Sequence, residues 1–211
     1  MQELLKIGVE AKKIGTSKSK LIFPKYRNDK DKNINDKDKK RISEQEARFL
    51  FVRELENPEQ TKYYYSVETP TEKKYRFPKK KNPKIDKEKG RSGSFDICLY
   101  EKFDDKDYPK RTCFIEFKAL SVDKQDISKD FLKLICDQGG LTNYFVHIIK
   151  NSNSGTYSKV ESKYNKAIDI ATTQGIEKSE LKIFLCDIGK KEIYLYEVDK
   201  EEKKVKSQKI F

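Results

Sequence analysis

Histidine is almost missing from this sequence, since it occurs once in 211 residues. A catalytic site with paired histidines is therefore excluded, and no pattern around His147 supports a serine–histidine triad. His147 lies in the apolar run from Tyr144 to Ile149, which predicts a buried strand in which the imidazole makes a local hydrogen bond. Any hydrolytic chemistry must then depend on carboxylates, lysine and a metal ion.

Cysteine is also scarce, and no two of the four cysteines have the Cys-x-x-Cys spacing. This argues against zinc ligands and disulfides. Three of the four lie in apolar strand patterns, and we expect all of them to be reduced, buried and equivalent to small hydrophobic residues: Cys98, Cys113, Cys136 and Cys186.

Long apolar runs are missing as well. No stretch approaches the roughly 18 to 20 apolar residues that cross a membrane, and the first residues lack the apolar core of a signal peptide. We therefore expect a cytoplasmic protein with no membrane partner.

Charge, in contrast, is abundant. Charged residues make up 39% of the chain and hydrophobic residues 35%, and the formal net charge is +12. The sequence predicts a small core, a densely ionic surface and a nucleic acid as partner. We interpret residues 1–42, with a charged loop from Lys25 to Arg41, as an N-terminal extension, and residues 43–211 as one domain.

Two predicted strands carry the candidate chemistry. In the first, Ser94 to Tyr100, the apolar residues Phe95, Ile97 and Leu99 alternate with a polar series that begins at Asp96, which predicts a half-buried strand. Asp96 is therefore expected on the less apolar face.

The second strand, Thr112 to Ala119, places Glu116 and Lys118 two residues apart and so on one face. If the two strands form an antiparallel hairpin, Asp96, Glu116 and Lys118 converge. Carboxylates and an ammonium are costly to bury unless they pair or bind a metal, and oxygen ligands suit Mg²⁺ or, as a substitute, Mn²⁺. The alternative is an ordinary amphipathic hairpin with a solvated Glu–Lys pair.

The motif formed by Gly90, Asp96 and Glu116-Phe117-Lys118 resembles the PD-(D/E)XK nuclease superfamily, over roughly residues 43–150. Phe95 stands where that family often has proline. The resemblance implies a mixed central β-sheet flanked by helices, with a restriction-endonuclease-like αβββαβ core. It also implies metal binding by Asp96 and Glu116, and a water assisted by Lys118.

A helix is predicted to begin after Ser43, where Glu46 completes a capping box. Many members of the family place a further glutamate on the first helix, near the metal. Glu44 falls on the apolar stripe of the predicted helix and is the better candidate by face, whereas Glu46 already has a capping role. Both are kept as candidate metal ligands.

A basic segment from Lys73 to Arg91 holds ten basic and two acidic residues and leads directly into the Asp96 strand. It predicts phosphate contacts, with a solvated charged loop as the alternative. The candidate nucleic-acid-binding residues here are Lys79, Lys80, Lys81, Lys84, Lys89 and Arg91.

A further helix is predicted after Lys118, with Asp126 or Ser128 as its cap and Gly139 and Gly140 after its end. Asp130, Lys133 and Gln138 on this helix are candidate substrate contacts, or solvated helix positions. The segments beyond it predict a strand at 144–149, a helix at 160–171 and a C-terminal hairpin of 181–188 with 192–198.

The sequence therefore predicts a small Mg²⁺-dependent nuclease that acts on DNA rather than RNA, in restriction, another defence system or repair. Two alternatives stay open: a non-catalytic nucleic-acid-binding protein within a larger assembly, and a subunit whose basic surface contacts an acidic protein. A homodimer or a place in a larger defence complex is compatible with either.

Overall fold

The structure, a computed structural model, describes residues 43–56, 63–79, 81–101, 110–150, 152–174, 179–199 and 202–211. The predicted extension at residues 1–42 lies outside the described residues. In the described part of the chain, three helices and eight strands form a mixed α/β fold.

The sheet is mixed, with its strands in the order β2-β1-β3-β4-β5-β6-β7-β8. Its centre, β4-β5-β6, is parallel, and both flanks are antiparallel. The strands are β1 (Tyr64–Arg76), β2 (Lys84–Ile85), β3 (Arg91–Tyr100), β4 (Arg111–Ala119), β5 (Thr142–Ile149), β6 (Glu180–Asp187), β7 (Glu192–Asp199) and β8 (Lys204–Lys209).

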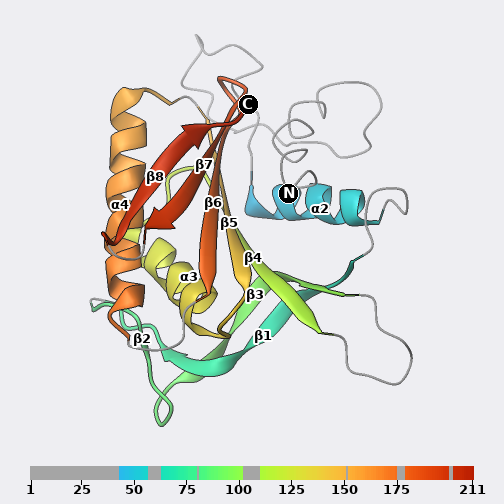
Figure 1. Cartoon of the computed structure of the whole chain (residues 1–211), viewed down its shortest axis with the longest axis vertical. Helices are drawn as coiled ribbons and strands as arrows, with labels where there is room; N and C mark the ends of the chain where they lie inside the picture. Colours follow the sequence, from blue (N-terminus) through green and yellow to red (C-terminus); the bar gives the residue numbers. More distant parts are fainter. Residues whose placement is uncertain are drawn as a thin grey trace, which may run out of the picture.

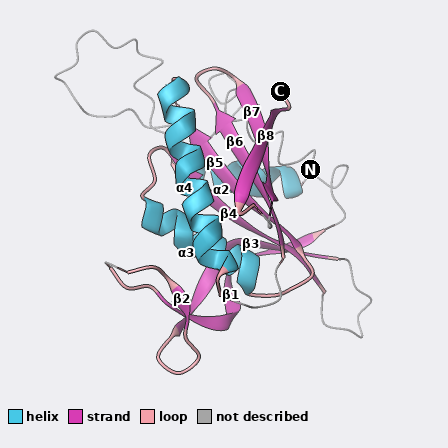
Figure 2. Ribbon diagram, turned by 60° about the vertical axis from the view of Figure 1, so that its left-hand side comes forward, coloured by secondary structure: helices cyan, strands magenta, loops and turns pink. Residues whose placement is uncertain are grey.

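The helices cover the sheet from two sides, as Figures 1 and 2 show. Helices α3 (Lys124–Cys136) and α4 (Ser154–Thr172) pack on one face, and α2 (Glu44–Leu55) packs on the other. The two faces of β4 show why: Phe114 joins the apolar cluster beneath α3 and α4, whereas Ile115 and Phe117 join the cluster beneath α2. The prediction of a mixed sheet flanked by helices is confirmed.

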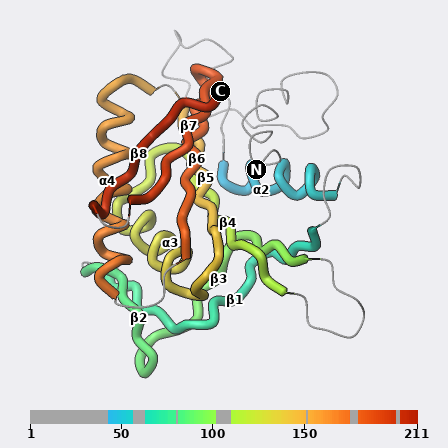
Figure 3. The backbone as a smooth tube through the Cα atoms, viewed as in Figure 1, coloured from blue at the N-terminus to red at the C-terminus, as the bar shows by residue number. Residues whose placement is uncertain are grey.

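The backbone trace in Figure 3 shows how the lower part of the molecule is built from β1, β2 and β3. β2 pairs with β1 only beside Tyr75 and Arg76, so the basic segment forms a short arm at the end of β1. The base of this arm is fixed to α3, because the Asp137 carboxylate accepts hydrogen bonds from the Lys73 amide and the Tyr75 hydroxyl, each at 2.9 Å. The arm therefore has a defined position relative to α3.

Several element boundaries differ from the prediction. The first strand, expected to end at Pro70, continues to Arg76 through an irregularity in its pairing with β3. Pro70 is tolerated there because β2 pairs with only the last residues of β1, which leaves Pro70 on a free edge. Helix α3 begins at Lys124 after Asp123, before the expected caps, and β8 was not predicted.

Other local predictions are confirmed. Ser43 and Glu46 form the capping box of α2, and β6 and β7 form the C-terminal hairpin. All four cysteines are free and buried. No helix within the described ranges combines the length and apolar character needed to cross a membrane.

Candidate active site

The centre of the candidate site is the point where β3 and β4 separate. Their ladder ends at the pair Ile97 and Ile115, and beyond it the Asp96 carboxylate replaces the missing backbone partner. Asp96 Oδ2 accepts a hydrogen bond of 2.7 Å from the Phe117 amide. Phe95 and Ile97 pack in clusters on opposite faces of the sheet, so the simple alternation predicted for this strand is wrong at Asp96.

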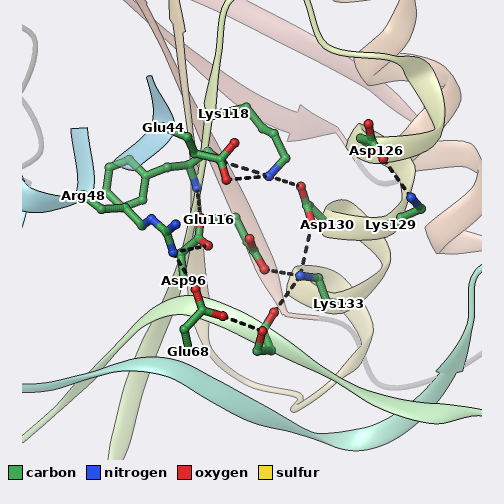
Figure 4. Close-up of polar contacts among 12 residues, drawn as sticks. Glu44, Arg48, Glu68, Asp96, Glu116, Lys118, Asp126, Lys129, Asp130 and Lys133 are labelled. Carbon is green, nitrogen blue, oxygen red and sulfur yellow. Dashed lines mark hydrogen bonds and ion pairs between the residues drawn. The ribbon is translucent and has the colours of Figure 1, made fainter. Parts of the chain in front are cut away.

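This irregularity orients Asp96 toward the residues at the end of β4. Glu116 and Lys118 extend from β4 on the face covered by α3, and Glu116 is only 2% exposed. Lys118 Nζ lies 3.3 Å from Glu44 Oε1 and 3.1 Å from Asp130 Oδ2 (Figure 4). The structure therefore brings together the three residues predicted to carry the chemistry, and adds Glu44 from α2 and Asp130 from α3.

Lys133 does not occupy the solvated helix position that was the alternative for it. Instead of facing solvent, its ammonium is buried beside Glu116, with which it forms an ion pair, and lies 3.1 Å from Asp130 Oδ1. It also donates a hydrogen bond of 2.8 Å to the Ser94 carbonyl. The alternative of a solvated helix position is wrong for Lys133, because the carboxylates of the site hold its ammonium inside. Its contact with substrate stays a prediction.

Two further residues complete the ionic network, and sequence reasoning missed both. Arg48 Nη1 lies 2.6 Å from Glu68 Oε1 and 3.1 Å from Asp96 Oδ1. The spacing of Arg48, four residues after Glu44, places it one helical turn further on the same side of α2 and was an available signal. Nothing in the sequence marked Glu68, which has a positive φ of 50° within β1.

We refer to the eight residues of this network as the charge cluster: Glu44, Arg48, Glu68, Asp96, Glu116, Lys118, Asp130 and Lys133. Five carboxylates against three cations leave two formal negative charges when all are ionised. Asp96, Glu116 and Asp130 are buried, and an excess of negative charge among them is costly without a further cation.

Burial sets the protonation of this cluster. It raises the pKa of Glu116 well above its ordinary value, and the neighbouring charge of Asp130 adds to the effect. Burial also raises the pKa of Asp96, against the hydrogen bond from the Phe117 amide, which lowers it. For Lys118, burial favours the neutral amine, but the surrounding carboxylates outweigh it and raise the pKa. The lysine therefore remains an ammonium at neutral pH.

An open cavity of about 440 Å³ lies against one side of the cluster. Its wall includes Glu44, Lys118 and Asp130, together with Asp123, Asp126 and Lys129 from the first turns of α3. Solvent and a substrate can therefore reach the end of β4 from this side, while Glu116 stays behind it.

The two glutamates at the start of α2, Glu44 and Glu46, make different contacts. Glu44 Oε1 contacts Lys118, and burial raises the pKa of Glu44. Glu46 instead accepts a hydrogen bond of 2.6 Å from the Ser43 amide, which completes the capping box. Only Glu44 belongs to the charge cluster.

The predicted nucleic-acid-binding residues are only partly near this site. Lys79, Lys81, Lys84, Lys89 and Arg91 are exposed on the basic arm. Lys80 lies outside the described residues.

The arm approaches the first turns of α3, because the Lys79 carbonyl accepts a hydrogen bond of 2.7 Å from Gln125 Nε2. Gln138, at the opposite end of α3, belongs neither to the charge cluster nor to the cavity wall.

The carboxylates of the cluster are hard oxygen donors of the kind that Mg²⁺ and Mn²⁺ accept. Among the described residues, no group of three or more His, Cys, Asp or Glu side chains is arranged to hold a metal ion. The ammonium of Lys118 separates Glu44 from Asp130, and that of Lys133 separates Glu116 from Asp130. Asp130 Oδ2 is buried and has the Lys118 ammonium as its ion-pair partner at 3.1 Å, so the carboxylate donors suit a cation and the lysines now stand between them.

His147 is structural, as predicted. It lies in β5, and its ring nitrogens contact the Tyr164 hydroxyl and the Leu120 carbonyl, each at 2.8 Å. The carbonyl can only accept, so Nε2 carries the proton and Nδ1 accepts from Tyr164. Burial lowers the pKa of His147 to about 4, which keeps the imidazole neutral.

Comparisons with protein-family models, with curated proteins and with solved structures found no match for this chain.

Proposed function

We propose that the chain is a divalent-metal-dependent nuclease, with DNA as the favoured substrate. The observation that carries the proposal is the convergence of Asp96, Glu116 and Lys118 where β3 and β4 separate, beside an open cavity. Two buried carboxylates and a permanently charged lysine at a strand end are costly, and a phosphodiesterase site gives a reason for all three.

The order of the elements supports the same proposal. With the two-residue β2 set aside, the chain runs α2-β1-β3-β4-α3-β5, which is the αβββαβ order that the resemblance to PD-(D/E)XK nucleases implies. Asp96 lies on β3 and Glu116 and Lys118 lie on β4, the two positions that the motif requires. We therefore propose a restriction-endonuclease-like core.

The roles of the residues follow from their positions. Asp96 and Glu116, with Glu44 from α2, would hold the metal ion. When bound, a divalent metal lowers the pKa of its water and stabilises the charge that develops on the phosphate. Lys118 lies in the cavity wall and orients the attacking water, and Glu44 and Asp130 hold its ammonium in place.

The basic arm provides the grip on the substrate backbone. Its lysines are exposed, and its turn at Lys79 is hydrogen-bonded to the same end of α3 that forms the cavity wall. Phosphates held by the arm would therefore lie next to the cavity. Contacts of this kind give affinity without sequence selectivity.

The proposal is tested by incubating the full chain with supercoiled plasmid, single-stranded DNA and RNA, in Mg²⁺ or in EDTA. We expect cleavage only with the metal, and its loss in Asp96→Asn, Glu116→Gln and Lys118→Met. Asparagine keeps an acceptor for the Phe117 amide, so the first variant should stay folded.

Asp126→Asn is the matched control, because Asp126 lines the cavity but contacts only Lys129. Full activity in Glu116→Gln would refute the assignment. Binding of DNA without cleavage in any metal would favour the non-catalytic alternative.

A further inference from the structure

The ammonium of Lys133 lies in a cage of oxygen atoms. Its three contacts come from three elements: Glu116 Oε1 on β4, Asp130 Oδ1 on α3 at 3.1 Å, and the Ser94 carbonyl on β3 at 2.8 Å (Figure 4). Two carboxylates and a backbone carbonyl are also the ligands that proteins use for hard divalent cations. Lys133 therefore occupies a position suited to a cation.

The side chain is fixed in this cage along its whole length. A Cβ atom added at Gly93 would lie 3.2 Å from Lys133 Cδ, so the glycine leaves room for the lysine stem. The ammonium also lies 5.6 Å from the centre of the Phe95 ring, and the side chain is 9% exposed. The stem and the ammonium of Lys133 are therefore both enclosed by neighbouring groups.

The charge of Lys133 is equally fixed. Its ammonium forms ion pairs with two buried carboxylates, Glu116 and, at 3.1 Å, Asp130. Removing one partner of a buried ion pair leaves the other charge uncompensated. Lys133 is therefore a permanent cation of the site.

The balance of the charge cluster sets how many more positive charges it takes. With Lys133 in place, five carboxylates face three cations, so at most two formal negative charges remain, the full two being reached when every carboxylate is ionised. One divalent ion neutralises this excess, and a second would overcharge the cluster. The balance therefore favours a single ion.

We propose that Lys133 is a built-in second cation: the charge cluster binds one divalent metal ion, and the Lys133 ammonium stands where a two-metal phosphodiesterase holds its other ion. This inference rests on the proposed function, since it concerns the metal of that site. In two-metal sites the ions act as a clamp on the attacking and leaving oxygens, and here a lysine supplies one of the two charges.

The stoichiometry of metal binding tests the inference without any measurement of activity. The full chain, stripped of metal, is titrated with Mn²⁺ in a calorimeter, and bound Mn²⁺ is counted independently by equilibrium dialysis. We expect one ion per chain in the wild type. Lys133→Ala empties the oxygen cage, so this variant should bind one ion more.

Lys129→Ala is the matched control. Lys129 lies one helical turn before Lys133 on α3, and its one ion pair among the described residues is with Asp126 at 2.8 Å, so the stoichiometry should not change. Lys133→Met serves as a second variant, because it keeps the stem beside Gly93 and Phe95 and removes only the charge. Its melting temperature should rise more on addition of Mn²⁺ than that of the wild type, since the metal then replaces the missing cation.

The outcomes separate the inference from the function beneath it. Two ions bound by the wild type would overturn the inference and leave a metal-dependent nuclease intact. An unchanged stoichiometry in a folded Lys133→Ala chain, or equal melting shifts in Lys133→Met and the wild type, would also overturn it. A wild-type chain that binds no Mn²⁺ or Mg²⁺ at all would refute the metal site itself.

Discussion

His147 gives a prediction whose magnitude follows directly from the structure. Its imidazole is 2% exposed, and burial lowers its pKa from 6.5 to about 4. The unfolded chain binds the proton near the ordinary value and the folded chain does not. The folded state therefore keeps its full stability above pH 6.5 and loses stability as the pH falls toward 4.

The size of the loss follows from the two pKa values. The difference between 6.5 and about 4 corresponds to about 3 kcal/mol of unfolding free energy, roughly three quarters of which is lost by a pH of about 4.5. The variant His147→Gln cannot titrate, and its amide can still donate to the Leu120 carbonyl and accept from Tyr164. The carboxylates titrate in both proteins, so the difference between the two stability curves isolates the histidine.

Urea denaturation in EDTA between a pH of about 7 and about 4.5 measures this difference, which we expect to be about 2.5 kcal/mol. Because the chain has one histidine, NMR of its ring also gives the folded-state pKa without an assignment problem. Parallel stability curves for the two proteins, or a measured pKa near 6.5, would refute the reasoning. Such a result would also reopen the case for His147 as an acid or base.

Three further predictions concern the site and the arm. Glu44→Gln should lower activity and weaken Mg²⁺ binding, as measured by cleavage rates across a Mg²⁺ series. Glu46→Gln should change neither, since glutamine also serves in a capping box. The reverse pattern would show that Glu46, and not Glu44, serves the site. Gly90→Ala should destabilise the arm by roughly 2 kcal/mol or more, because the added Cβ would lie 2.2 Å from a backbone oxygen. Limited proteolysis and urea denaturation measure this loss of stability. A variant as resistant to protease and urea as the wild type would contradict the turn geometry. Changing the lysines at positions 79–81 to alanine should weaken DNA binding equally on unrelated sequences. In fluorescence anisotropy, the slope of log affinity against log salt concentration should flatten by up to about three units. An unchanged slope would mean that these lysines are only solvated.

Local patterns were sufficient to predict most of the fold. The capping box at Ser43 and Glu46 located the start of α2, and the apolar run around His147 located β5. Both signals act over a few residues and so can be read from the chain alone. The predicted end of β1 at Pro70 failed because the effect of a proline depends on whether its strand edge is paired, which is a property of the sheet.

In the candidate site, too, the residues marked by local patterns were predicted, and those placed by contacts between elements were not. Asp96, Glu116 and Lys118 were found because they interrupt apolar strands, and Glu44 because it falls on the buried face of α2. The alternation around Asp96 was misread, since the break in the β3–β4 ladder depends on a hydrogen bond to the Phe117 amide. No spacing within β3 could reveal a partner on another strand.

Lys133 shows what sequence reasoning cannot reach. Lys129 and Asp130 lie one helical turn before Lys133, and a lysine on such a polar helix face is typical of a solvated position. Its burial depends on Glu116 of another element and on the space left by Gly93. Gly93 leaves space for the lysine stem, since a Cβ atom there would lie 3.2 Å from Lys133 Cδ. The ammonium that we propose as the second cation is thus positioned by a glycine and a strand break, which become visible only when β3, β4 and α3 are packed together.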